Sequence, residues 1–376
     1  MVKVIPVTNS RQLKDFIMLP FRLYTEDPNW VAPLISEQKK FFDPRKNPYY
    51  DHSEVMLFLA MENNQVVGRI SAQTNTPHNK EHNDNIGFFG FFECEKNHIA
   101  AKALFDAAYE WNRSKGKDAM RGPMNFSVNQ ECGLLVKGFD TPPYVMMMHN
   151  HAYYQELFEA CGMQKTMDMY AYYSFYDKMP ERVAKAAELI QRRFPCNIRS
   201  LSKNKVELKK DIETVFRIYT RAWEYNWGNV PMTDKEFDHI VKELLPIADP
   251  DMVFIAEVDG KPAGFSLALP NYNEVLKVMH GRINPITLLK ALKAKKHISS
   301  ARVITMGVIK EYQNRGIDTL FYYHSYKNGI PKGIVHGEFS WVLETNTMML
   351  RVAEMLKADP YKTYRLYDHK IEQNTK

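Results

Sequence analysis

The segment Val308–Asp318, VIKEYQNRGID, lies between an apolar run typical of a β-strand and a run with helical periodicity. Its one glycine, Gly316, stands directly before the helix-like run. The N-terminus of a helix presents N–H groups without intrahelical partners and the positive end of the helix dipole, so it can bind an anion. Two interpretations follow: a phosphate-binding turn, or an ordinary capped start of a helix.

The composition predicts a globular protein of roughly two domains, at about 150 residues per domain. The chain has 376 residues, 45% of them apolar and 25% charged. The charge excess, 50 − 44 = +6, is small and dispersed; it predicts no nucleic-acid partner, although it favours an anionic small ligand. No apolar run approaches the length of about 20 residues that crosses a bilayer. The N-terminal residues lack the pattern of a signal peptide, so we expect a cytoplasmic protein without a membrane partner. A monomer and a homodimer both stay open.

The four cysteines predict neither a disulfide framework nor a metal site. They lie far apart, with no C-x-x-C and no Cys/His cluster at the spacing of metal ligands. We expect reduced thiols that fill the core, at Cys94, Cys132, Cys161 and Cys196.

The chain contains an internal repeat. Residues 57–75 and 253–271 both consist of a β-rich run, a polar turn and a second β-rich run, which is typical of a hairpin. Ala60 corresponds to Ala256 and Gly68 to Gly264, each at an offset of 256 − 60 = 264 − 68 = 196. Each hairpin is followed by a strand, a helix, a strand, a short helix and an aromatic strand. In the first half these begin at 86–95, and in the second half at 300–309.

The two halves differ by insertions, which are common at functional loops. The first half has an extra loop at 128–148, and the second half an extra segment at 273–297. Before each hairpin lies a helical prelude; in the second half Thr233 and Glu236 form a predicted capping box. We expect a first domain at 1–176, a linker helix with a proline stop at 177–197, and a second domain at 198–376.

This order of elements resembles the GNAT (GCN5-related N-acetyltransferase) superfamily, and the repeat makes the chain similar to a tandem GNAT protein over nearly its whole length. The resemblance implies an α/β (α+β) fold with two tandem GNAT-like domains, each a mixed central sheet flanked by helices. The motif of the family, Q/R-x-x-G-x-G/A after V-x-P-E-Y, is matched at Gln313 and Gly316. Asp318 replaces the last small residue, and Lys310 replaces the usual proline.

The resemblance implies that this turn binds the pyrophosphate of acetyl-CoA or another acyl-CoA. Asp318 works against such binding unless its carboxylate caps the helix or points away. The first half has "ECEKNH" at the same place, without glycine and with Asn97 as the expected N-cap, so we place the acyl-CoA in the second half. The residues implied to bind the acyl-CoA are Met306, Val308, Gln313, Asn314, Arg315, Gly316, Ile317, Asp318 and Asn346.

In the family, a backbone N–H of the fourth strand, here near Met306 to Val308, donates to the thioester oxygen, and the fourth and fifth strands splay apart. The tyrosine that often serves as general acid is missing: Ala353 and Phe158 occupy its two positions. The candidate bases are Glu338 and Glu344, for which a surface carboxylate or a helix cap is an equally good interpretation. Asn346 is also a candidate N-cap.

The substrate-binding candidates lie in two segments. Residues 221–230, RAWEYNWGNV, lie between the two prelude helices, which in the family often form one wall of the acceptor site. Trp223 continues an apolar helical face and is expected in the core, which leaves Tyr225 and Trp227. In the first half, Asn125 and Asn129 belong to a glycine- and proline-rich loop that would hold a substrate or act as a lid.

The resulting hypothesis is an acyl-CoA-dependent N-acyltransferase that acts on a small-molecule or peptide amine by direct transfer. The missing tyrosine and Asp318 favour an alternative, a binding protein that has lost the chemistry. A transferase that uses an aminoacyl-tRNA is a third possibility, against which the absence of a basic patch argues.

Overall fold

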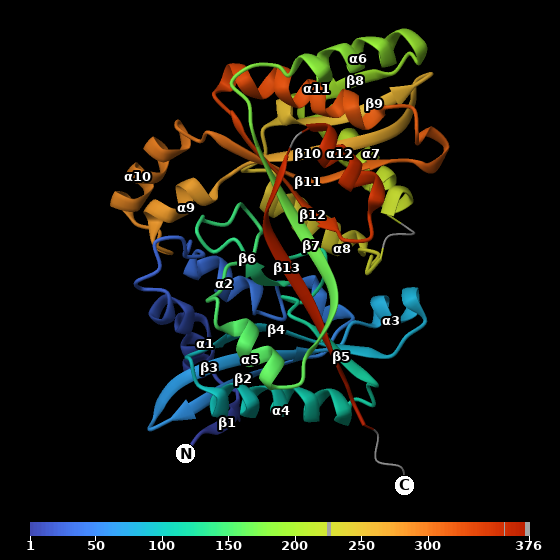
Figure 1. The fold of residues 1–376 in the computed structure, drawn as a ribbon. Coiled ribbons are helices and arrows are strands. Elements are labelled where there is room, and N and C mark those ends of the chain that lie inside the picture. Colours follow the sequence, from blue (N-terminus) through green and yellow to red (C-terminus); the bar gives the residue numbers. More distant parts are fainter. Residues whose placement is uncertain (224–226, 357, 373–376) are drawn as a thin grey trace. The chain divides into compact units, whose positions relative to one another are not determined.

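The computed structural model describes residues 1–223, 227–356 and 358–372 (Figure 1). The first half contains two helices before a hairpin, as expected, and then alternates strands with helices. Its elements are β1 (Lys3–Pro6), α1 (Ser10–Leu23), α2 (Ile35–Phe41), the 3-10 helix η1 (Pro48–Asp51), β2 (Val55–Glu62), β3 (Gln65–Gln73), α3 (Thr76–His82), β4 (Ile86–Cys94), α4 (His98–Ser114), β5 (Ala119–Gly122), β6 (Leu134–Lys137), α5 (Tyr154–Ala160) and β7 (Gln164–Phe175).

The second half repeats this order after the helix that the sequence predicts as a linker. Its elements are α6 (Glu181–Arg193), β8 (Asn197–Ser200), α7 (Lys205–Trp223), α8 (Asp234–Leu244), η2 (Pro250–Met252), β9 (Val253–Val258), β10 (Lys261–Pro270), α9 (Asn273–Met279), α10 (Pro285–Lys295), β11 (Ser300–Val308), η3 (Lys310–Tyr312), α11 (Ile317–Gly329), η4 (Ile330–Lys332), β12 (His336–Leu343), α12 (Thr347–Leu356) and β13 (Asp359–Lys370).

The local signals in the sequence correspond to observed structure. Both predicted hairpins are present as antiparallel pairs, β2 with β3 and β9 with β10. The capping box is formed: the Thr233 side chain accepts from the N–H of Glu236, and the Glu236 side chain accepts from the N–H of Thr233. Asn97 accepts from the N–H groups of Ile99 and Ala100, each at 3.0 Å, and so caps α4 as expected.

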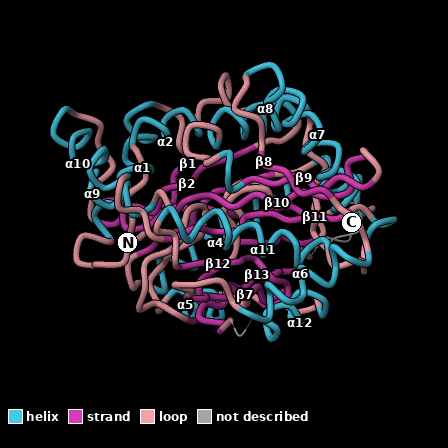
Figure 2. Tube along the Cα trace, turned by 90° about the horizontal axis from the view of Figure 1, so that it is seen from above, coloured by secondary structure: helices cyan, strands magenta, loops and turns pink. Residues whose placement is uncertain are grey.

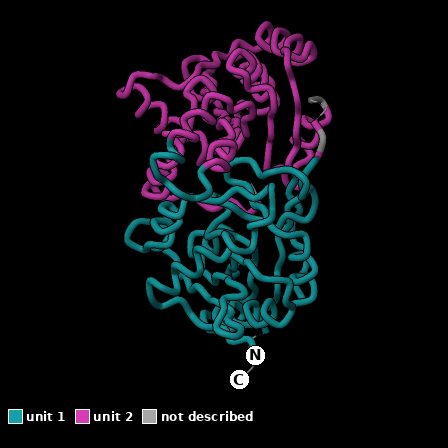
Figure 3. Tube along the Cα trace, turned by 90° about the vertical axis from the view of Figure 1, so that its left-hand side faces the viewer, with its two compact units in different colours: residues 1–170, 279–288, 361–376 teal, residues 171–278, 289–360 magenta. Residues whose placement is uncertain are grey.

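The chain divides into two compact units whose limits differ from the expected domains (Figure 3). Unit 1 comprises residues 1–170, 279–288 and 361–376, and unit 2 comprises 171–278 and 289–360. The last strand of the second half therefore belongs to unit 1, where β13 pairs antiparallel with β5. Arg121 on β5 forms two hydrogen bonds of 2.8 Å with Asp368 on β13, which favours this pairing. The expected linker helix α6 is an integral part of unit 2, because it packs on α11.

The strands have helices on both faces (Figure 2), and each unit contains both parallel and antiparallel strand pairs. In unit 2, α6 and α11 cover one face of β9 to β11 and α7 covers the other, so that two apolar clusters form. The parallel pairs are β4 with β5 and β11 with β12; all other pairs with printed register are antiparallel in the described part of the chain. This is the α/β (α+β) architecture that the sequence predicts.

Candidate functional site

The strands β11 and β12 separate in the middle of unit 2. Their parallel ladder joins only Ser300–Val303 to His336–Phe339, although β11 continues to Val308 and β12 to Leu343. A β-bulge in β11 lies at the same point: Val303 pairs with Ala268 and Thr305 with Leu267, which leaves Ile304 as an extra residue. Bulges redirect a strand and commonly lie beside active sites. The predicted splay of the fourth and fifth strands of the second half is therefore present.

The splay exposes one edge of β11. The N–H of Ile309 donates to the carbonyl of Ala263 on β10 at 2.9 Å. Because successive N–H groups of a strand point to opposite sides, those of Met306 and Val308 point away from β10, toward the side that β12 has left. The carbonyl of Val308 points the same way and accepts from Nε2 of Gln313 at 3.0 Å. Two N–H groups in the predicted region thus face the space between the separated strands.

The matching edge in unit 1 is closed. The N–H of Glu95 donates to Val67 at 2.9 Å, just as Ile309 donates to Ala263, and β4 also contains a bulge. However, the N–H of Cys94, the counterpart of Val308, donates to the hydroxyl of Tyr154 at 2.9 Å. The hydroxyl of Tyr153 donates to the carbonyl of Cys94 at 2.8 Å. The N–H and the carbonyl of Cys94, at the end of β4, are therefore both engaged by side chains of the same unit.

The loop after β5 adds to this closure. The Oδ1 atom of Asn125 accepts from the N–H of Phe91 at 2.9 Å, and its Nδ2 donates to Glu131 at 3.1 Å. Asn125 is buried, so this proposed substrate residue holds the loop in place. Asn129 is half-buried, and its N–H donates to Ser127 Oγ at 3.1 Å.

The buried carboxylate of Glu93 is also bound by side chains of unit 1. Glu93 accepts hydrogen bonds of 2.7 Å from both Tyr24 and Tyr154, and Arg69 lies 3.6 Å from its other oxygen. Burial raises the pKa of Glu93, while Arg69 and the two hydroxyls act in the opposite direction. These contacts fasten α1 and α5 to the sheet.

The turn between β11 and α11 has the backbone of a tight connection. Asn314 has φ 61° and Gly316 has φ 81°, and the carbonyl of Gly316 accepts the first helical hydrogen bond from the N–H of Leu320 at 3.2 Å. Gly316 is the N-cap of α11 and provides no side-chain cap. The first N–H groups of α11, starting at Ile317, therefore lie beside the turn.

Helix α6 packs against this turn and gives Gly316 a second reason to be glycine. A Cβ atom at Gly316 would lie 2.5 Å from Cδ1 of Ile190. The guanidinium of Arg315 lies over the ring of Phe194 at 4.8 Å and that of Tyr312 at 5.6 Å. The resemblance attributes Gly316 to the approach of a phosphate. In the structure its positive φ favours glycine without any ligand, and Ile190 of α6 leaves little room for a Cβ atom.

Asp318 points its carboxylate at the start of its own helix. The backbone N–H groups of Thr319 and of Asp318 itself lower its pKa, but burial outweighs them, so that the pKa is raised overall. This carboxylate is the strongest local obstacle to a bound phosphate, because both would use the same end of the helix dipole.

The two candidate bases have different surroundings. Glu338 is buried; it accepts from Ser340 Oγ at 2.7 Å and lies 3.6 Å from Nε of Arg302, so its charge is held within the sheet. Glu344 is half-buried and directly follows the last part of β12, which is not paired with β11. Asn346 accepts from the N–H of Met349 at 3.2 Å, which confirms it as the N-cap of α12.

The aromatic candidates after α7 fall into two groups. Trp223 stacks on Tyr219 at 5.1 Å and packs on Gly307, where a Cβ atom would overlap it, so it belongs to the core as expected. Trp227 is half-buried. Tyr225 lies outside the described residues.

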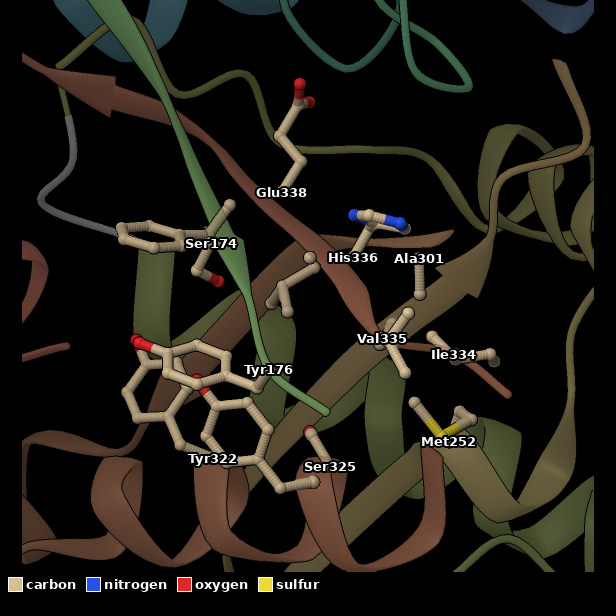
Figure 4. A pocket seen from close by; sticks show the side chains of 15 residues that line it. Ser174, Tyr176, Met252, Ala301, Tyr322, Ser325, Ile334, Val335, His336 and Glu338 are labelled. Carbon is tan, nitrogen blue, oxygen red and sulfur yellow. The ribbon is translucent and has the colours of Figure 1, made fainter. Parts of the chain in front are cut away.

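A hollow lies on the α11 side of the paired part of β11 and β12, and it is mainly apolar (Figure 4). About 590 Å³ of space without atoms lies in and over this hollow, and part of that space is open solvent. The hydroxyl of Tyr322 is buried there without a hydrogen-bond partner among the described residues. The carboxylate of Glu338 points away from Tyr176 and Tyr322. The lining includes Met252, Ala268, Val303, Ile334, Phe339, Tyr176, Tyr322 and Tyr326.

The chain is similar to two curated bacterial proteins over almost its full length. It is 37% identical over 376 residues to the bacterial ceramide synthase of Caulobacter vibrioides, covering 98% of this chain and 97% of that protein. It is 35% identical over 369 residues to the protein YghO of Escherichia coli, covering 96% and 94%. The chain belongs to their family. No family model matches it.

Solved structures show that this member of the bacterial ceramide synthase and YghO family has a tandem GNAT fold. A tandem GNAT protein from the clavulanic acid biosynthesis pathway has a TM-score of 0.58 at 12% identity, covering 99% of both chains. A GCN5-related N-acetyltransferase from Sphaerobacter thermophilus has a TM-score of 0.53 at 12% identity, covering 98% of this chain and 96% of that chain. The predicted resemblance is thus confirmed at the level of the fold.

Three features of the site in this family member have no clear signal in its sequence. Arg302 lies in a strand and Tyr322 in a helix, and no motif in the sequence indicates a role for either. Both are buried, which only the structure shows. The contact of Ile190 with the turn depends on the packing of α6.

The cysteines are free, and burial raises the pKa of Cys94 to about 12, so it is not a reactive thiolate.

In the described part of the chain no group of His, Cys, Asp and Glu side chains could hold a metal ion, and no helix is long and apolar enough to cross a membrane.

Proposed function

We propose that this protein is an N-acyltransferase that transfers a long-chain acyl group from an acyl-CoA to the amine of a lipid-like acceptor. The observation that carries the proposal is the open edge of β11 in unit 2, where the N–H groups of Met306 and Val308 point toward the side that β12 has left. The relative named as a ceramide synthase supports the class of acceptor, because a ceramide is the amide of a fatty acid and a long-chain amino alcohol.

The open N–H groups suit the oxygen of a thioester. Negative charge develops on this oxygen during acyl transfer, and fixed N–H donors stabilise it in the transition state. The phosphates would lie at the turn of residues 313–318, near the exposed side chains of Asn314 and Arg315 and the first N–H groups of α11. Asp318 opposes them, so this part of the site fits less well than the edge of β11.

The chemical step needs one base and no metal ligand from this chain. The neutral amine nitrogen forms the new C–N bond, and the C–S bond breaks with its electron pair on sulfur. The second proton that the nitrogen loses when it becomes the amide is taken up by this thiolate, so coenzyme A is released as the thiol. Glu344 is the proposed base for the proton of the ammonium, because it is half-buried and directly follows the segment of β12 that is not paired with β11. A thiol has a pKa of roughly 8.5, so its anion can leave without the tyrosine that Ala353 replaces.

The hollow beside β11 and β12 suits an aliphatic chain. Its wall is mainly apolar, as in most small-molecule sites, and the buried hydroxyl of Tyr322 provides a donor for one polar group. We propose that part of the acyl chain or of the long-chain amine occupies it.

The direct test uses the purified protein with hexadecanoyl-CoA and a long-chain 2-amino-1,3-diol. The expected result is release of coenzyme A thiol together with formation of the amide by mass spectrometry. Glu344→Gln is expected to lower kcat by about 10²-fold or more, as for loss of a general base, with acyl-CoA binding retained. Binding without turnover of any amine would instead favour the non-catalytic protein that Asp318 and Ala353 allow.

Asp318→Asn is expected to bind coenzyme A about twofold to fivefold more tightly, because a charge at a helix N-terminus contributes roughly 0.3–1 kcal/mol. Acidification should strengthen binding to the unchanged protein, since protonation of Asp318 removes the same charge, and its raised pKa brings this protonation to a higher pH. For the same reason the contribution of this group to stability is largest below the ordinary carboxyl pKa and decreases as the pH rises through the raised value.

Isothermal titration calorimetry at several pH values checks this prediction. Asp259→Asn, in the exposed turn between β9 and β10, is the matched control and should leave the affinity unchanged. Weaker binding by Asp318→Asn would contradict the proposed position of the phosphates.

A further inference from the structure

Helix α10, in the segment that only the second half contains, is turned with its large apolar side chains outward. Ile286, Leu289 and Leu292 are 67%, 70% and 63% exposed. The half-buried residues are the small ones, Thr287, Ala291 and Ala294, at the i, i+4, i+7 spacing of one helical face. A surface helix of a globular protein normally buries its large apolar stripe. Here the opposite arrangement leaves Ile283, Ile286, Leu288, Leu289 and Leu292 exposed.

The same segment concentrates positive charge. Residues 280–297 contain Arg282, Lys290, Lys293, Lys295 and Lys296, and no aspartate or glutamate. These 18 residues carry a net charge of +5, and the whole chain carries 50 − 44 = +6. The five cationic residues are all exposed. This segment is therefore a local concentration of exposed positive charge within a chain whose overall excess is small.

The helix is built to keep this orientation. Asn284 Oδ1 accepts from the N–H of Thr287 at 3.0 Å, and Thr287 Oγ1 accepts from the N–H of Asn284 at 2.9 Å, so the two residues cap the helix reciprocally. Before the helix, the carbonyl of Gly281 accepts from the N–H of Ile35 at 3.0 Å. At the last residue of α10, Nζ of Lys295 lies 5.6 Å from the ring centre of Tyr272. The exposed leucines are thus presented on a preformed helix (orange in Figure 1).

We infer that α10 docks the protein on the surface of a lipid bilayer that contains anionic lipids. The eleven residues of α10 span only about 16 Å at 1.5 Å per residue, too short to cross the membrane but long enough to lie in its interface. The lysines lie between the leucine and isoleucine side chains on the exposed side of α10 and do not form a separate face. Leucine and isoleucine can enter the boundary between headgroups and acyl chains while these lysines extend their long side chains to anionic headgroups. A second copy of the chain is a poorer occupant, because it would bring five further cations to the same surface.

This inference goes beyond the proposed function and does not depend on it. The expectation of no membrane partner rests on the lack of spanning segments and of a signal peptide, and an interfacial helix of this length matches neither pattern. A bilayer surface would also be the source of a long-chain amine, but the docking itself can be measured without any substrate.

The test is cosedimentation of the full chain with vesicles of phosphatidylcholine alone and vesicles that also contain phosphatidylglycerol. The full chain is expected to bind the anionic vesicles at least about tenfold more tightly, and added salt should weaken this binding because it screens the charges. Leu289→Glu/Leu292→Glu is expected to reduce binding at least about tenfold. Lys290→Gln/Lys293→Gln should remove most of the preference for phosphatidylglycerol.

Val206→Glu, at a position on α7 that is 66% exposed, is the matched control and should bind as the unchanged protein does. Circular dichroism should show the same helix content for all variants, since every substituted side chain is exposed. Equal binding of the double leucine variant and the unchanged protein overturns the inference. So does a dimer in solution that this variant dissociates, since α10 would then contact a second copy.

Discussion

Val308→Pro is expected to lower kcat for acyl transfer by about 10²- to 10³-fold, the cost of removing one donor to a developing oxyanion. Proline has no N–H, and the N–H of Val308 is one of the two that face away from β10. For the same reason the substitution removes no hydrogen bond between β10 and β11, and a proline is tolerated where the N–H lies outside a ladder. The expected loss is therefore in the chemical step, with the affinity for acyl-CoA changed little.

Lys310→Pro is the matched control for this experiment. It introduces the same ring two residues later, at the first position of η3, where the GNAT superfamily, which the chain resembles, usually has proline. Its kcat should stay within about threefold of the unchanged protein, because the donors on β11 are intact. Steady-state kinetics with hexadecanoyl-CoA measures both variants, and full activity of Val308→Pro with an unchanged melting temperature would remove β11 from the proposed site.

Arg302→Met is expected to destabilise unit 2 by about 3–5 kcal/mol, the usual cost of leaving one partner of a buried ion pair without the other. Arg302 is 2% exposed; its Nε donates to Ser340 Oγ at 2.8 Å, and its Nη2 donates to the carbonyl of Ser340 at 3.2 Å. The substitution would leave the carboxylate of Glu338 buried in the sheet without its cationic partner. Because such a carboxylate prefers its protonated form, the loss of stability should be smaller in acid and grow as the pH rises.

The double variant Arg302→Met/Glu338→Leu separates this account from a simple packing defect. Replacing both charges by apolar side chains is often neutral or stabilising, so the double variant should regain most of the stability that the single variant loses. Urea denaturation followed by tryptophan fluorescence measures the difference. If the two variants are equally unstable, the ion pair is not the cause.

The local elements of this fold could be predicted because their signals lie within a few residues. Asp259 and Gly260 both have positive φ in the turn between β9 and β10, as a two-residue hairpin requires. Thr233 with Glu236, and Asn97 with the two N–H groups after it, form caps that the residue types alone favour. Ile99 shows the limit of the periodicity: it follows the apolar spacing of α4 but is exposed in the first turn of the helix.

The candidate site could be predicted only in part. The resemblance to the GNAT superfamily implies a splay between the fourth and fifth strands of the second half, and the short ladder between β11 and β12 agrees with it. The same reasoning could not show that Tyr154 and Asn125 close the corresponding edge of unit 1, because those contacts join residues 60 and 34 positions apart. Likewise, the motif contains Asp318, but only the fold shows that its carboxylate lies at the start of its own helix.

By itself the sequence determines the repeated order of helices and strands, because periodicity, caps and hairpin turns are local and were kept in both halves. The tertiary structure decides which strands become neighbours: β13, from the end of the chain, completes unit 1 beside β5. It also decides that the turn VIKEYQNRGID lies against α6 and that the edge of β11 stays open. Strand partners and open edges depend on contacts between distant residues, such as Arg121 with Asp368, and no local pattern encodes them.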